Sequence, residues 1–160
     1  MNGTKGGDTG LRELSRIMEG GTVVSTTLKQ LHLNDCDIGP QGRSVSRVPL
    51  AFILLATWGD SIPSPPTGIA WLGGAFARGG CPALEELYLS KNEKLGAEGI
   101  RYLATALRDA GSRCQLRILD IRWTEMGLPG AECLAIAFQS HACPKLEVLH
   151  MMQVCLDLHR

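Results

Sequence analysis

The stretch LEELYLSKNEKL, residues 84–95, carries the pattern that governs the whole chain. Leucines stand at its first, fourth and sixth positions, a polar residue follows three positions later, and an aliphatic residue ends it. This motif recurs at nearly constant spacing, which is typical of stacked units that cannot bury their apolar faces alone. Its four copies are Leu28-Leu31-Leu33-Cys36-Ile38, Leu84-Leu87-Leu89-Asn92-Leu95, Leu116-Leu119-Ile121-Thr124-Met126 and Leu146-Leu149-Met151-Val154-Leu156.

A glycine and a helical pattern follow the motif. Gly99 is followed at four and eight positions by Leu103 and Leu107, and Gly130 by Leu134 and Phe138. This spacing predicts one buried face of a short helix. A helix between two strands makes them parallel, because parallel pairs need a crossover connection. The sequence predicts parallel strands at 28–34, 84–90, 116–122 and 146–152, and helices near 69–78, 99–110 and 130–140. An upstream helix with the same spacing is predicted at Gly10, Leu14 and Met18.

The motif, with Cys36 in its first copy and the helix GIRYLATAL at 99–107, resembles the ribonuclease-inhibitor-like class of leucine-rich repeats. The resemblance covers residues 10–42 and 69–160. It implies an α/β leucine-rich-repeat solenoid, a short horseshoe with parallel strands on the concave face and helices on the convex face. Inhibitors, immune-sensor ligand domains, small-GTPase activators and cytoskeletal scaffolds share this class, so the fold alone identifies no function.

The first copy is interrupted. Leu28 and Leu84 are fifty-six residues apart, whereas the next two spacings are thirty-two and thirty, and removing residues 43–68 restores the helix register. We therefore divide the chain into a flexible N-terminus, 1–9, and an array of about 3.5 units, 10–160, with a non-repeat insert at 43–68. The insert is either a retained intron or a functional loop. The first is favoured because long unstructured loops inside compact units are uncommon.

Composition excludes several classes of partner. Sixteen basic and sixteen acidic residues cancel, so no broad electrostatic field favours nucleic acid or anionic lipid. The apolar run at 50–56 is far shorter than the ~20 residues of a membrane-spanning helix. No secretory signal is visible at 1–10. The sequence therefore predicts a cytoplasmic protein without membrane or nucleic-acid binding.

Catalytic and metal-binding patterns are not found. The six cysteines follow the repeat and include no Cys-x-x-Cys, which favours small buried side chains over disulfides. His32 and His150 occupy the same strand position in copies one and four, so parallel pairing places them roughly 14 Å apart, too far to share a metal ion. We expect no enzyme activity and no cofactor.

The concave face is the candidate binding surface. Residues between the inward leucines should point to solvent there, and Trp, Tyr and Arg dominate binding hot spots. Arg122 and Trp123 beside Tyr88 form the sharpest expected patch. In the alternative, Trp123 packs beneath a neighbouring unit. The candidate partner-binding residues are His32, Glu86, Tyr88, Asp120, Arg122, Trp123 and His150.

The chain reaches Arg160 where the fourth helix is expected to begin. This predicts an end without a polar capping unit, which solenoids normally need, so self-association through that end is one expectation. We predict a non-catalytic scaffold that binds a protein partner of unknown identity on the concave face. A small-GTPase regulator of the activating type and a truncated fragment of a larger leucine-rich-repeat protein are the alternatives.

Overall fold

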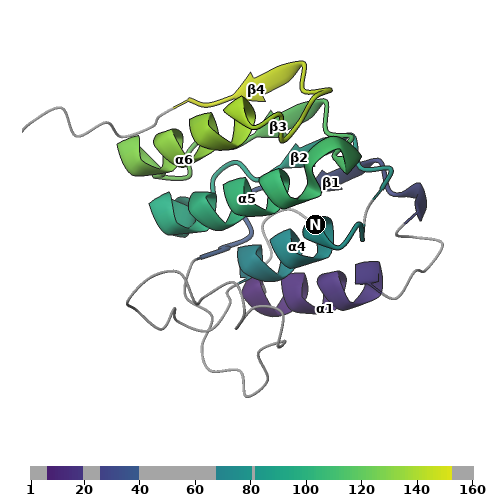
Figure 1. The fold of residues 1–160 in the computed structure, drawn as a ribbon. Coiled ribbons are helices and arrows are strands. Elements are labelled where there is room, and N and C mark those ends of the chain that lie inside the picture. Colours follow the sequence, from purple (N-terminus) through teal and green to yellow (C-terminus); the bar gives the residue numbers. More distant parts are fainter. Residues whose placement is uncertain (1–6, 20–25, 40–67, 81, 153–160) are drawn as a thin grey trace, which may run out of the picture.

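The computed structural model describes residues 7–19, 26–39, 68–80 and 82–152. A layer of helices lies along one side of a parallel sheet (Figure 1). The insert predicted at 43–68 lies outside the described residues except for Gly68. The elements are α1 (Gly7–Glu19), β1 (Gln30–His32), α4 (Gly68–Ala77), β2 (Glu86–Tyr88), α5 (Gly96–Ala110), β3 (Ile118–Asp120), α6 (Gly127–Gln139) and β4 (Val148–His150), with single 3-10 turns η1 (Glu93–Leu95) and η2 (Gly111–Arg113).

The strands confirm the predicted parallel order. They pair as β1-β2-β3-β4, and the middle leucine of each strand lies in register with the next. Each strand is three residues long, shorter than predicted, but its hydrogen bonding continues one residue further. The amide of Leu33 donates to the Tyr88 carbonyl at 2.8 Å, and that of Leu89 to the Asp120 carbonyl at 2.8 Å.

A residue in the left-handed conformation stands three positions after each of the first three strands. Asp35, Lys91 and Trp123 occupy the same repeat position and have φ values of 54°, 60° and 60°. Their amides donate to the following unit, as Trp123 does to the Met152 carbonyl at 3.0 Å. The ladder therefore continues between units after the strands have turned away, although residues with side chains seldom adopt this conformation.

The helices pack side by side in the order α1, α4, α5, α6 (Figure 1). The predicted faces of α4 and α5 are confirmed, since Leu72, Phe76, Leu103 and Leu107 are all buried. A Cβ on Gly130 would lie 2.8 Å from the Met126 Cβ and 3.4 Å from the Ile100 Cβ. Glycine thus allows α6 to approach α5 closely.

The first helix differs in its details from the sequence pattern. It begins at Gly7, within the segment 1–9 that we expected to be flexible, while residues 1–6 lie outside the described part. Met18 is buried as predicted, but Leu14 is only half-buried. Leu11 and Ser15 share the buried face instead, and the Ser15 hydroxyl donates to the Leu11 carbonyl at 2.7 Å. This bond within the helix satisfies the polar group that Ser15 buries.

Asn92 joins the first two loops from inside the core. Its side chain is 1% exposed. The amide oxygen accepts from the backbone N–H groups of Cys36 and Ile38, both at 3.1 Å. The amide nitrogen donates to the carbonyls of Leu33 at 2.8 Å and Leu89 at 2.7 Å. One side chain therefore satisfies buried backbone groups of two consecutive units, which explains why a polar residue is buried at this position of the second unit.

A row of alternating charges crosses the sheet just before the strands begin. Lys29 contacts Glu85 at 2.9 Å, Glu85 contacts Arg117 at 3.7 Å, and Arg117 holds Glu147 through two bonds of 2.8 and 3.0 Å. Each residue directly follows the first leucine of its repeat. We call these four residues the charge ladder. Each of its contacts joins two units that are neighbours in the stack.

The charge ladder predicts a loss of stability in acid. Hydrogen bonding and charge from Lys29 lower the pKa of Glu85, and a hydrogen bond from Arg117 lowers that of Glu147. A lowered carboxyl pKa stabilises the folded state above its ordinary value of 4.5, and this contribution is lost as the pH falls through the lowered value. Arg117→Gln should therefore lower the urea midpoint at neutral pH, by an amount that shrinks below pH 4.5.

Chemical unfolding followed by circular dichroism at several pH values measures this effect. Arg108→Gln is the control, because Arg108 is exposed on α5. Among the ion pairs of the described residues, Arg108 takes part in one, with the adjacent Asp109 at 3.9 Å. An equal deficit for Arg117→Gln at neutral and acid pH would contradict the ladder as a source of stability.

Candidate functional site

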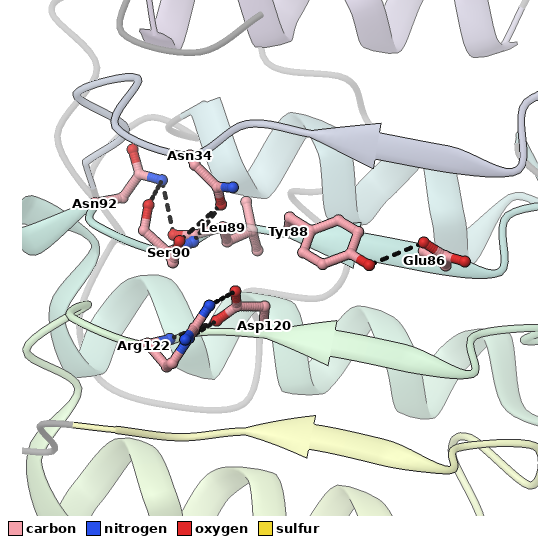
Figure 2. A network of polar contacts seen from close by, with 8 residues as sticks. All are labelled: Asn34, Glu86, Tyr88, Leu89, Ser90, Asn92, Asp120 and Arg122. Atoms are coloured by element: carbon pink, nitrogen blue, oxygen red, sulfur yellow. Dashed lines mark hydrogen bonds and ion pairs between the residues drawn. The ribbon is translucent and has the colours of Figure 1, made fainter.

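The face of the sheet opposite the helices, which we call the open face, collects the predicted site residues. Figure 2 shows the sheet from this side, with the helices behind it. His32, Tyr88, Asp120 and His150 occupy one register position across the four strands. The structure therefore brings these four residues into the single column that the repeat predicts.

His32 and Tyr88 form an aromatic stack between β1 and β2. Their ring centroids are 4.4 Å apart and their planes differ by 9°. The Tyr88 hydroxyl donates to Glu86 Oε2 at 2.9 Å, as Figure 2 shows. This hydrogen bond, with smaller contributions from burial and from nearby carboxylates, raises the pKa of Tyr88. The ring is thus held at both its face and its hydroxyl before any partner is present.

We predicted that Asp120 points to solvent, but the structure buries it. It is 1% exposed, because the Arg122 guanidinium folds back over it from the same chain segment (Figure 2). Arg122 Nε and Nη2 donate to its two carboxylate oxygens at 2.9 and 2.7 Å. Burial raises the pKa of Asp120, but the hydrogen bonds and charge of Arg122, together with a smaller contribution from His150, lower it by more. The carboxylate is therefore ionised and neutralised within the surface.

Trp123 lies apart from the column. It follows β3 in the left-handed turn, level with Lys91 of the preceding unit, whose amide donates to the Arg122 carbonyl at 2.9 Å. Trp123 stands three residues beyond Asp120 and outside the strand, so at most roughly 10 Å of chain separates the two residues. The expected patch beside Tyr88 therefore divides into a column and a separate turn residue. The Trp123 side chain is 39% exposed, so it is not packed beneath a neighbouring unit.

A small polar network lies between the column and the turn. Asn34 Oδ1 accepts hydrogen bonds from the backbone amide and the hydroxyl of Ser90, at 2.8 and 2.9 Å (Figure 2). Ser90 is buried. The Asn34 side chain thus satisfies the polar groups that Ser90 buries, across β1 and β2. Their position after the strand leucines was visible in the sequence, but their pairing depends on the register.

The described residues form neither a metal-binding cluster nor a membrane-spanning helix. His32 and His150 lie on the outermost strands β1 and β4, as their repeat position predicts. Among the described residues, no three His, Cys, Asp or Glu side chains form a group that could hold a metal ion. No helix in the described ranges has the length and apolar character needed to cross a bilayer.

Comparison with known proteins supports the repeat assignment. A family model described as Leucine Rich repeat matches three segments, 24–45, 80–104 and 114–135. These segments contain β1, β2 and β3 and the beginnings of α5 and α6. Three segments of the chain are thus similar to leucine-rich repeats, and the described residues form an α/β arrangement of parallel strands and helices. Searches against curated proteins and solved structures returned no match.

Proposed function

We propose that the chain is a non-catalytic module that binds a protein partner on the open face, and that this face is the concave surface of a short solenoid. Stacked repeats of this kind offer extended binding surfaces formed by their strands, and three segments match leucine-rich repeats. The observation that carries the proposal is the column of His32, Tyr88, Asp120 and His150, on the face away from the helices.

The open face is ordered before binding. Tyr88 is stacked on His32 and hydrogen-bonded to Glu86, while Arg122 is held by Asp120. Side chains that are already fixed lose less conformational entropy when a partner binds. Such preorganisation favours the open face over the long, exposed side chains of the helices.

The charges of the open face restrict the kind of partner. Asp120 and Arg122 neutralise each other, so the guanidinium offers its remaining N–H donors and its flat face without an unbalanced charge. The stacked rings of His32 and Tyr88 add an aromatic surface. A partner with an apolar or aromatic group flanked by hydrogen-bond acceptors fits this arrangement better than a strongly charged peptide.

Mutations on the open face should weaken partner capture. Tyr88→Ala and Trp123→Ala should each reduce affinity about thirtyfold, corresponding to about 2 kcal/mol, because large aromatic side chains dominate binding hot spots. Tyr88 is half-buried and Trp123 is exposed, so their removal should change the melting temperature only slightly. A pull-down from lysate followed by titration of the captured protein measures the loss.

Ile136→Ala supplies the matched control. Ile136 is a large apolar residue on α6 that is 58% exposed, so the mutation removes apolar surface from the helix layer. Capture should be unchanged. Weaker capture by Ile136→Ala, with normal capture by both aromatic variants, would move the binding surface to the helices and refute the proposal.

Finer assignments remain part of the proposal. The ribonuclease-inhibitor-like type, the horseshoe curvature, the cytoplasmic location and the scaffold role rest on the sequence pattern alone. The comparisons do not favour a GTPase-activating role, and a GTP hydrolysis assay against small GTPases would detect it.

A further inference from the structure

Two cysteines of consecutive units meet in the loops that lead into their strands. Cys114 precedes β3 and Cys143 precedes β4, and their sulfur atoms are 3.2 Å apart. Both are free thiols with 7% and 9% exposure. Such proximity is not required for apolar packing, since a cysteine behaves as a small hydrophobe without a second sulfur beside it.

We propose that Cys114 and Cys143 are the site of a reversible disulfide that a small peroxide oxidant forms between two consecutive repeats. The sulfurs must approach from 3.2 Å to a bond length of about 2.05 Å. This change of about 1 Å is within reach of small side-chain rotations, because the two residues are already in contact. The bond would join segments separated by 29 positions in the chain.

One of the two cysteines lines a cleft. It has a volume of about 200 Å³, and Cys114 lines it together with Phe76, Leu107 and Arg113. Cys143 does not line this cleft. Cys114 is therefore the cysteine of the pair that a small molecule in this cleft would contact.

The two thiols also differ in acidity, and Cys114 is the more acidic of the two. The hydrogen bond with Cys143 lowers the pKa of Cys114 to about 7, although burial opposes the change. The same hydrogen bond and burial raise the pKa of Cys143. Either sulfur can donate in the neutral pair, and Cys143 is the donor once Cys114 is ionised. Thiolates are the reactive form of cysteine, so the cysteine that lines the cleft is also the nucleophile.

The chemistry balances with hydrogen peroxide as the oxidant. The Cys114 thiolate attacks one peroxide oxygen, the O–O bond breaks, and the departing hydroxide takes a proton to become water. The resulting sulfenic acid is attacked by the Cys143 sulfur, an S–S bond forms, and a second water carries away the remaining oxygen. Two thiols lose two protons and two electrons in total. A thiol reductant reverses the reaction by exchange.

The disulfide should stabilise the pair of units. Closing a loop of this length restricts the unfolded chain, so we expect the melting temperature to rise by roughly 5–10 °C on oxidation. The full-length chain is treated with equimolar peroxide, quenched, digested with trypsin and analysed by mass spectrometry. The expected product is residues 114–117 linked to residues 123–145, and dithiothreitol should separate them.

Two variants identify the bond, because residues 123–145 also contain Cys133. Cys133→Ala should retain the linked product and the rise in melting temperature. Cys143→Ala should lose both. The proposal is overturned if the parent chain forms no such product, if Cys133→Ala abolishes it, or if the product forms without raising the melting temperature. The parent and Cys133→Ala results decide the question even if Cys143→Ala does not fold.

Discussion

Leu119→Ala should lower the free energy of unfolding by about 2–5 kcal/mol, the range for leucine truncation in a packed core. Leu119 is fully buried in β3, and its register partners Leu87 and Leu149 belong to the units on either side. The cavity would therefore open at two interfaces between units. Against a total stability of about 5–15 kcal/mol for ordinary domains, this loss is a large fraction and should lower the urea midpoint clearly.

Urea unfolding followed by circular dichroism measures the change. Leu128→Ala is the matched control, because it removes the same atoms from a leucine on α6 that is 57% exposed. Its free energy of unfolding should stay within about 0.5 kcal/mol of the parent. Equal unfolding curves for Leu119→Ala and the parent would show that Leu119 is not part of a packed core.

Asn92→Ala should cost roughly 2–5 kcal/mol for a different reason. The mutation leaves the buried amides of Cys36 and Ile38 without the side-chain acceptor, and it removes the donor to the Leu33 and Leu89 carbonyls. An unsatisfied buried backbone group costs about 1–3 kcal/mol. Several such groups are affected together, so the loss should exceed that of any single hydrogen bond.

Thr124→Ala tests this reasoning at the equivalent position of the next unit. The Thr124 hydroxyl is also buried, but it makes one side-chain hydrogen bond in the described structure, donating to the Ile121 carbonyl at 2.8 Å. We expect a loss of about 1 kcal/mol. If Thr124→Ala were as damaging as Asn92→Ala, the bridging bonds of Asn92 would not explain its effect.

The repeat allowed the strand order and the column to be predicted, because one period fixes both the inward leucines and the residues between them. Helix α5 was predicted for the same reason, since Leu103 and Leu107 define its buried face. Strand ends were less accurate. Each of the first three strands ends three residues before a left-handed residue such as Lys91 or Trp123, and these side chains give no sign of that conformation.

Contacts that depend on side-chain direction could not be predicted. Asp120 occupies an outward position, yet Arg122 two residues later covers it completely. The sulfur contact between Cys114 and Cys143 joins positions that differ by one residue in the repeat, so alignment of the copies did not reveal it. The charge ladder was visible in the sequence, because Lys29, Glu85, Arg117 and Glu147 directly follow the first leucine of each copy.

Alternation of sign in the charge ladder constrains how such an array can lengthen. Exact duplication of the third unit would set Arg117 beside its own copy, and the new interface would carry a repulsion that the existing ones lack. Duplication of the second and third units together would set Glu85 beside Arg117 again and keep every neighbouring pair opposite in sign. Of two engineered arrays, one extended by a single unit and one by a pair, the first should lose less stability when salt is added, because salt also screens its repulsive contact. Growth by pairs of units is the mode of expansion that this edge of the sheet accommodates.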